Sequence, residues 1–186
     1  MKALVLIGVL VVILAIVGGV LGGTYNSLVK KSTTIDAQWA QVETQYQRRY
    51  DLIPNLVNSV KGYMTQEKTI FDNLAAARTK YGSATTTDEK AVAGGELETT
   101  LSRLLVVMEN YPVLRSVEAI TSLMDELAGT ENRISVERGR YNTEVRDYNT
   151  AIKTFPGNMM AGMFGFTQHE YFKSVSGADQ VPKVEF

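Results

Sequence analysis

The chain has 186 residues, and its 19 Lys and Arg nearly balance its 20 Asp and Glu, which gives a formal net charge of −1. So small a net charge creates no global field that would attract nucleic acid. The absence of cysteine excludes disulfides, thiolate chemistry and cysteine zinc sites, and a single histidine excludes paired-histidine metal sites. The sequence also lacks a nucleophile–base pair and a phosphate loop, so we predict no metal, no cofactor and no nucleic-acid partner.

The first element is an apolar run from Ala3 to Leu21 that contains no charged, polar or proline residue. As a helix it spans about 30 Å, the thickness of the hydrocarbon core of a bilayer. A cleaved signal peptide has a shorter apolar core, and the residues that follow this run resemble a cleavage site only weakly. We therefore predict that residues 1–23 form an uncleaved, single-pass N-terminal anchor in a lipid bilayer.

The end of the run carries two small-x-x-x-small pairs, a spacing that lets helix backbones approach closely in lipid. The pairs are Gly18 with Gly22 and Gly19 with Gly23. A flexible hinge is the alternative interpretation. Because an apolar stripe continues beyond the glycines through Tyr25, Leu28 and Ile35, we predict homo-oligomerisation through the anchor and the juxtamembrane helix.

The lysines that flank the run give a weak indication of orientation. Lys2 precedes it, whereas Lys30 and Lys31 follow it. This excess favours the cytoplasmic side for the large domain, with the amino terminus outside, but a difference of one lysine leaves the side open.

Apolar residues then recur at alternating spacings of four and three from Ile35 to Tyr81, which is the period of coiled coils and helix bundles. Pro54 lies inside this run and predicts a kink or a break, and the unchanged phase across it favours the kink. A loop follows from Gly82, with Thr87 or Asp88 as the N-cap of the next helix.

Two further stripes follow, from Leu97 to Tyr111 and from Val113 to Phe155, and Gly94 and Gly95 weaken the helix prediction locally. We therefore predict an all-α fold in which the transmembrane helix continues into a long, up-and-down bundle. The elongated bundle occupies residues 24–155, with three helices, or four if Pro54 breaks the first. A short extended C-terminal tail, residues 156–186, packs on it and ends in an extended segment at 181–186. The Met- and Phe-rich stretch 159–166 offers either a sticky surface or packing on the bundle's own end.

Four charged residues occupy stripe positions and should face the bundle core: Arg49, Glu67, Glu131 and Arg138. One interpretation is a polar ligand or catalytic site, since bundle cores are where such sites are built. The other is a set of ion pairs that fixes helix register, and we favour it. A di-metal site would need paired Glu-x-x-His motifs, which the sequence lacks.

One stretch, from Arg48 to Val57, reads as a signature and contains Arg48, Arg49, Tyr50, Asp51, Pro54 and Asn55. Six further segments accompany it: 25–29, 109–115, 130–134, 141–149, 155–158 and 181–186. In order along residues 24–186, these segments resemble the LemA family of bacterial membrane proteins. Val113 departs from the pattern, in which an acid is common there.

The resemblance implies architecture more than activity: an N-terminal anchor, a bundle usually described as four-helical, and no established catalytic residues. Some relatives are associated with the formation of specialised internal membranes. Our hypothesis is a membrane-anchored, non-enzymatic scaffold or assembly protein that self-associates at the bacterial cell (inner) membrane, in membrane organisation or remodelling. The alternative is a ligand-binding or hydrolytic protein that uses the polar core layer. Apart from the bilayer and a second copy, the sequence identifies no partner.

Overall fold

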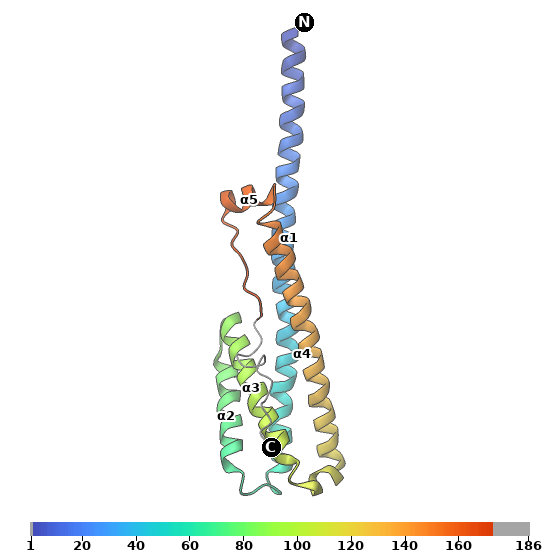
Figure 1. The fold of residues 1–186 in the computed structure, drawn as a ribbon, viewed down its shortest axis with the longest axis vertical. Coiled ribbons are helices and arrows are strands. Elements are labelled where there is room, and N and C mark those ends of the chain that lie inside the picture. The colour runs from blue at the N-terminus through green and yellow to red at the C-terminus, as the bar shows by residue number, and fades with distance from the viewer. Residues whose placement is uncertain (1, 173–186) are drawn as a thin grey trace, which may run out of the picture. The chain divides into compact units, whose positions relative to one another are not determined.

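The structure, a computed structural model, describes residues 2–172, and their secondary structure is helical without a strand. The elements are α1 (Lys2–Val60), α2 (Lys68–Ser83), α3 (Thr87–Met108), the 3-10 turn η1 (Pro112–Ser116), α4 (Glu118–Ala151) and α5 (Gly157–Phe164) (Figure 1). The predicted all-α fold class is confirmed. The extended segment predicted for residues 181–186 lies outside the described residues.

The chain folds into two compact units. Unit 1 consists of residues 2–38 and 139–171, and unit 2 consists of Trp39–Arg138 together with Phe172. Unit 1 therefore contains the apolar start of α1, the end of α4 and α5. Unit 2 contains the rest of α1, the antiparallel neighbours α2 and α3, and the start of α4.

The core of unit 2 is built from the predicted stripes, because residues at alternating spacings of four and three share one face of a helix. Its buried apolar residues include Val42, Tyr46, Ile53, Leu56 and Val60 of α1, Leu74, Ala77 and Tyr81 of α2, Leu97, Leu101, Leu104 and Met108 of α3, and Ile120, Leu127 and Ile134 of α4. Four helical segments thus contribute to this core.

The first helix passes through Pro54 and ends at Val60, so the break lies after the proline rather than at it. The turn at residues 61–67 resets the apolar phase, since Met64 is fully buried whereas the stripe residue Tyr63 is 49% exposed. The expected single stripe from Ile35 to Tyr81 therefore belongs to two helices. Pro54 does not break the first of them, and the additional helix arises from the turn after Val60.

The start of α3 is fixed by a capping box one residue earlier than expected. Thr86 Oγ1 accepts a hydrogen bond from the backbone N–H of Glu89 at 3.2 Å, and the Glu89 carboxylate accepts one from the backbone N–H of Thr86 at 3.1 Å. Backbone N–H donors of Thr85 and Thr86 lower the pKa of the Glu89 carboxyl. The predicted N-caps, Thr87 and Asp88, are instead the first two helical residues.

Gly94 and Gly95 lie buried inside α3 without interrupting it. A Cβ placed on Gly94 would lie 2.6 Å from a ring carbon of Tyr46, so only glycine lets the ring approach this closely. From the sequence alone these glycines are expected to weaken the helix, but the close packing of Tyr46 in unit 2 requires glycine at position 94.

Unit 1 buries Leu28 and Ile35 of α1 together with Tyr141, Val145 and Tyr148 of α4. The segment after α5 is tied to α4 by Asn149, whose side chain donates to the His169 carbonyl at 2.9 Å and accepts from the His169 N–H at 3.0 Å. These two hydrogen bonds hold the segment after α5 against α4 within unit 1.

The apolar start of α1 is the exception to this burial. The large apolar side chains of residues 4–20 are exposed, and the most apolar window of α1 has a mean hydropathy of 3.2 with none of it buried. Among the described residues, α1 is the one helix long and apolar enough to cross a membrane.

Candidate functional site

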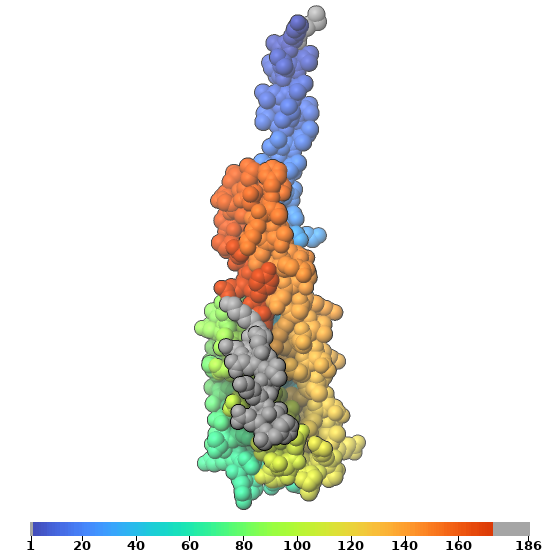
Figure 2. Space-filling view, in the orientation of Figure 1, coloured from blue at the N-terminus to red at the C-terminus, as the bar shows by residue number. Residues whose placement is uncertain are grey.

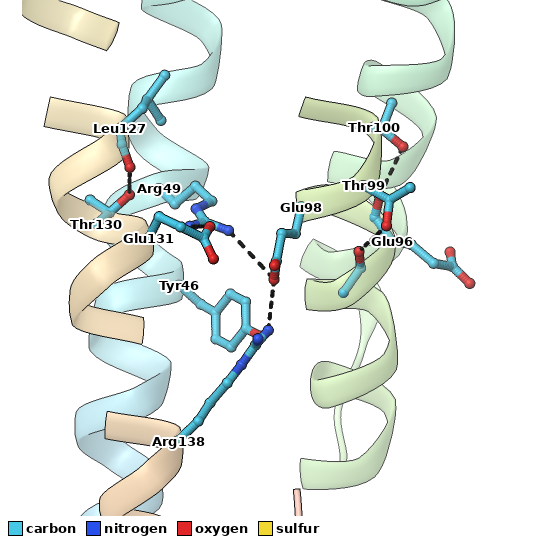
Figure 3. A network of polar contacts seen from close by, with 11 residues as sticks. Tyr46, Arg49, Glu96, Glu98, Thr99, Thr100, Leu127, Thr130, Glu131 and Arg138 are labelled. Atoms are coloured by element: carbon cyan, nitrogen blue, oxygen red, sulfur yellow. Dashed lines mark hydrogen bonds and ion pairs between the residues drawn. The ribbon is translucent and has the colours of Figure 1, made fainter. Parts of the chain in front are cut away.

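The candidate site is a polar layer inside unit 2, formed by Arg49, Glu98, Glu131 and Arg138 around the ring of Tyr46 (Figure 3). Arg49 is only 1% exposed, because its position on α1 continues the buried stripe. Its guanidinium forms an ion pair with Glu131 of α4, and its Nη1 lies 3.8 Å from a carboxylate oxygen of Glu98 on α3.

Glu98 joins the two arginines. The same carboxylate oxygen that faces Arg49 accepts a hydrogen bond from Arg138 Nη2 at 2.8 Å, and Arg138 also donates to the Tyr46 hydroxyl. Two guanidinium groups therefore meet two carboxylates, so the layer is formally neutral. A paired, hydrogen-bonded arrangement of this kind is what allows charge to be buried at all.

Burial shapes the protonation of this layer. Desolvation raises the pKa of the Tyr46 hydroxyl above its usual range, although the charge and hydrogen bond of Arg138 act in the opposite direction. Desolvation alone would lower the pKa of Arg138, but the contacts with Tyr46 and Glu98 outweigh it and raise that pKa. Tyr46 therefore stays protonated and Arg138 stays charged at neutral pH.

The structure brings together three of the four predicted residues, Arg49, Glu131 and Arg138. Glu67 lies elsewhere, in the turn before α2, where its carboxylate accepts a hydrogen bond from the Tyr111 hydroxyl at 3.1 Å. The reason is that the turn after Val60 resets the phase of the apolar stripe. Glu98 takes the expected place of Glu67, and its position directly after the stripe residue Leu97, at the flank of the apolar face, is the signal that could have found it.

Pro54, in the signature-like stretch from Arg48 to Asn55, is the centre of a second set of contacts, which stabilises α1 where the proline interrupts its hydrogen bonding. Proline lacks the N–H that would bond the carbonyl four residues back, which is that of Tyr50. Arg78 of α2 donates its Nε–H to this carbonyl at 3.4 Å, and its guanidinium carbon lies 3.9 Å from the centroid of the Tyr50 ring. One arginine thus compensates the proline and stacks on the tyrosine.

The remaining signature residues face outward along α1. Arg48 pairs with Glu126 at 2.6 Å on the surface, and Asp51 accepts a hydrogen bond from Gln47 at 3.0 Å. Arg48, Asp51 and Asn55 lie along one shallow groove on α1. Within residues 2–172 no group of three or more His, Asp or Glu is placed to hold a metal ion.

The predicted association glycines lie on the exposed start of α1. A Cβ placed on Gly18, Gly19, Gly22 or Gly23 would meet no atom within 4 Å. The stripe beyond them is different, because Leu28 and Ile35 are each 1% exposed. Leu28 and Ile35 therefore lie inside unit 1, whereas Tyr25, the first residue of that stripe, is 37% exposed.

These features define a class: an all-helical bundle protein with an exposed apolar N-terminal helix and a charge-paired layer in its core. Residues 38–186 match the LemA family, and the chain belongs to that family. It is also similar to magnetosome proteins MamQ 1 and MamQ 2 of Paramagnetospirillum magneticum, at 30% identity over 83% of this chain. Magnetosome protein MamQ of Magnetospirillum gryphiswaldense is 27% identical over the same share. The match covers 66% of the length of each of these relatives.

Proposed function

We propose that this protein is a membrane-anchored, non-enzymatic assembly protein that associates with its own copies at the bacterial cell (inner) membrane and serves in organising or remodelling that membrane. The observation that carries the proposal is the exposed start of α1. A continuous helix of Leu, Ile and Val side chains with none of its apolar window buried needs an apolar surrounding, and a bilayer supplies one of matching thickness.

The continuity of α1 supports an anchor rather than a removable leader. The helix runs without interruption from the apolar start to Leu28 and Ile35, which are buried in unit 1. Cleavage near Gly22 would cut within this helix. The resemblance to a family in which some relatives are associated with specialised internal membranes supports the role in membrane organisation.

We place self-association chiefly at the glycine pairs, since Leu28 and Ile35 of the juxtamembrane stripe are buried within unit 1 and only Tyr25 is exposed. In lipid, association depends on close backbone packing, and the open surface at Gly18 and Gly22 permits it. Gly18→Leu/Gly22→Leu should reduce the oligomer of full-length protein in mild detergent, measured by crosslinking or mass photometry. Gly8→Leu, on the same exposed helix, is the matched control. A wild-type chain that is monomeric at micromolar concentration would contradict self-association.

The anchor itself is tested in isolated membranes. We expect the chain to resist extraction at alkaline pH and to retain its N-terminus by intact mass analysis, apart from removal of the initiator methionine. A mature chain that starts near Gly22 or Thr24 would overturn the proposal. Protease accessibility of unit 2 in intact and permeabilised cells would establish which side of the membrane it occupies. The flanking lysines favour the cytoplasmic side.

A ligand-binding or hydrolytic role of the polar layer is the alternative, and one observation favours it. Arg49 Nε and Nη1 are buried without a hydrogen-bond partner among the described residues. The neutral pairing with Glu98 and Glu131 favours the structural role. Isosteric neutral substitutions in the layer separate the two: lost folding indicates structure, and lost function with an intact melting temperature and assembly indicates a site.

A further inference from the structure

We propose that residues 155–166, which comprise α5 and its flanks and are called the interface segment below, lie in the headgroup layer of the bilayer that α1 crosses. This inference rests on the proposed membrane anchor. It assigns lipid, rather than a second copy of the chain, as the material that covers the exposed apolar side chains of the interface segment.

The contact between α5 and α1 fixes the depth of the segment. The Phe164 ring centroid lies 4.8 Å from that of Tyr25, and the Phe166 centroid lies 5.7 Å from it. Tyr25 follows Leu21, the last residue of the apolar run, by four residues, which is about 6 Å of helix. The headgroup layer on each side of a bilayer is about 5–8 Å thick, so Tyr25 and the aromatic rings against it fall within that layer.

The apolar side chains of α5 are divided between the two sides of the helix. Gly157 and Met160 are buried within unit 1, whereas Met159 and Met163, one turn apart on the adjoining face, are exposed, Met163 by 69%. Phe155, just before α5, is 77% exposed. Figures 1 and 2 show this end of unit 1 beside α1, at the point where the bare apolar helix begins.

The surrounding charges fit a lipid surface. Lys30 and Lys153 are exposed, and Lys31 is half-buried. Residues 22–35 and 148–169 contain no Asp or Glu. Exposed methionine and phenylalanine side chains, in stretches whose only full charges are lysines, match an anionic headgroup layer over hydrocarbon. A surface that two copies bury against each other would instead bring like charges together.

The cysteine-free sequence permits an unambiguous test, because one introduced cysteine takes one label. Full-length Met163→Cys, Val12→Cys and Val106→Cys are each labelled with a small fluorophore and reconstituted into phosphatidylcholine–phosphatidylglycerol vesicles. Quenching is measured with lipids spin-labelled near the headgroup or near the chain end, and with aqueous iodide. Val106 on α3 is the matched control, because it is apolar and 64% exposed in unit 2.

We expect the label at Met163 to be quenched severalfold more by headgroup-proximal spin labels than the label at Val106, and to be shielded from iodide. The label at Val12 should respond most to the chain-end quencher. Lipid quenching at Val12 without lipid quenching at Met163 overturns the proposed location of the interface segment and leaves the proposed anchor standing. Within that result, iodide shielding at Met163 indicates cover by protein, and iodide access indicates open water. No lipid quenching at Val12 overturns the anchor, and the inference with it.

Discussion

The two units depart from the usual distribution of side chains in opposite directions. Unit 2 encloses charge, with Arg49 in its core, whereas unit 1 leaves the apolar start of α1 and Met163 outside. The buried charge is matched within the chain by Glu98 and Glu131. The exposed apolar surface has no such match among the described residues of unit 1, and under our proposal the bilayer provides it. The folding of unit 2 therefore depends on pairing within the chain, whereas the stability of the exposed surface of unit 1 depends on what surrounds it.

The first prediction removes the ion pairs inside unit 2, and we expect it to have the largest effect on stability. Glu98→Gln/Glu131→Gln leaves the buried guanidinium of Arg49 without a carboxylate, and losing the partner of a buried charge costs about 3–5 kcal/mol. Urea unfolding of the full-length chain in detergent, followed by circular dichroism, measures the loss.

Two matched controls sharpen this comparison. Glu126→Gln removes the exposed pair with Arg48 and should cost less than about 1 kcal/mol. Met163→Ser, on the exposed surface of unit 1, should leave the midpoint nearly unchanged. A double variant no less stable than Glu126→Gln would show that the polar layer does not hold unit 2 together.

The second prediction compares two helical glycines, one from each unit. Gly94→Ala places a methyl group against the Tyr46 ring, and the overpacking penalty of about 1–3 kcal/mol exceeds the gain in helix propensity of about 1 kcal/mol. Gly139→Ala in α4, at the boundary of unit 1, meets nothing within 4 Å and should stabilise by about 0.5–1 kcal/mol. Thermal unfolding of both variants checks the opposite signs. Equal shifts would mean that the Tyr46 ring moves aside freely.

The third prediction tests whether Arg78 compensates Pro54. Arg78→Ala should cost about 1–2 kcal/mol, because it removes a hydrogen bond to the Tyr50 carbonyl and a cation–π contact. In a Pro54→Ala background the backbone N–H of residue 54 supplies that carbonyl with a helical hydrogen bond, so the same substitution should cost less. A double-mutant cycle measures the coupling. Identical costs in the two backgrounds would mean that Arg78 stabilises the fold only by stacking on Tyr50. Lys80→Ala, which removes an exposed ion pair on the same helix, serves as the control.

The sequence predicts much of the fold, because the alternation of four and three is a local property that survives into the packed helices. It fails where packing between distant segments decides. The stripe cannot show that α1 ends at Val60, so Tyr63 and Glu67 are wrongly placed on a buried face. Glu98 lies at the flank of its stripe, and only the meeting of α3 with α1 and α4 brings it to Arg49. The hydrogen bond from Arg78 to the Tyr50 carbonyl spans 28 residues and leaves no periodic trace in the sequence.

The last prediction concerns pH and the tyrosines packed around this core. Burial, reinforced by the nearby Tyr46, raises the pKa of Tyr81 to about 12 from the usual value of 10. A group whose pKa is higher in the folded state stabilises the fold fully below its unfolded pKa, and that contribution is lost as pH rises through the folded pKa. Unit 2 should therefore keep the Tyr81 contribution up to about pH 10 and lose it progressively towards pH 12.

Tyr81→Phe should make stability fall less steeply in this range. Because burial also raises the pKa of Tyr46, part of the fall should remain in the variant. Urea midpoints at a series of pH values, with tyrosinate absorbance recorded in parallel, give both quantities, and measurements at pH 8 provide the baseline for each variant. Identical slopes for wild type and Tyr81→Phe would show that the Tyr81 hydroxyl is no harder to ionise in the folded core than in the unfolded chain.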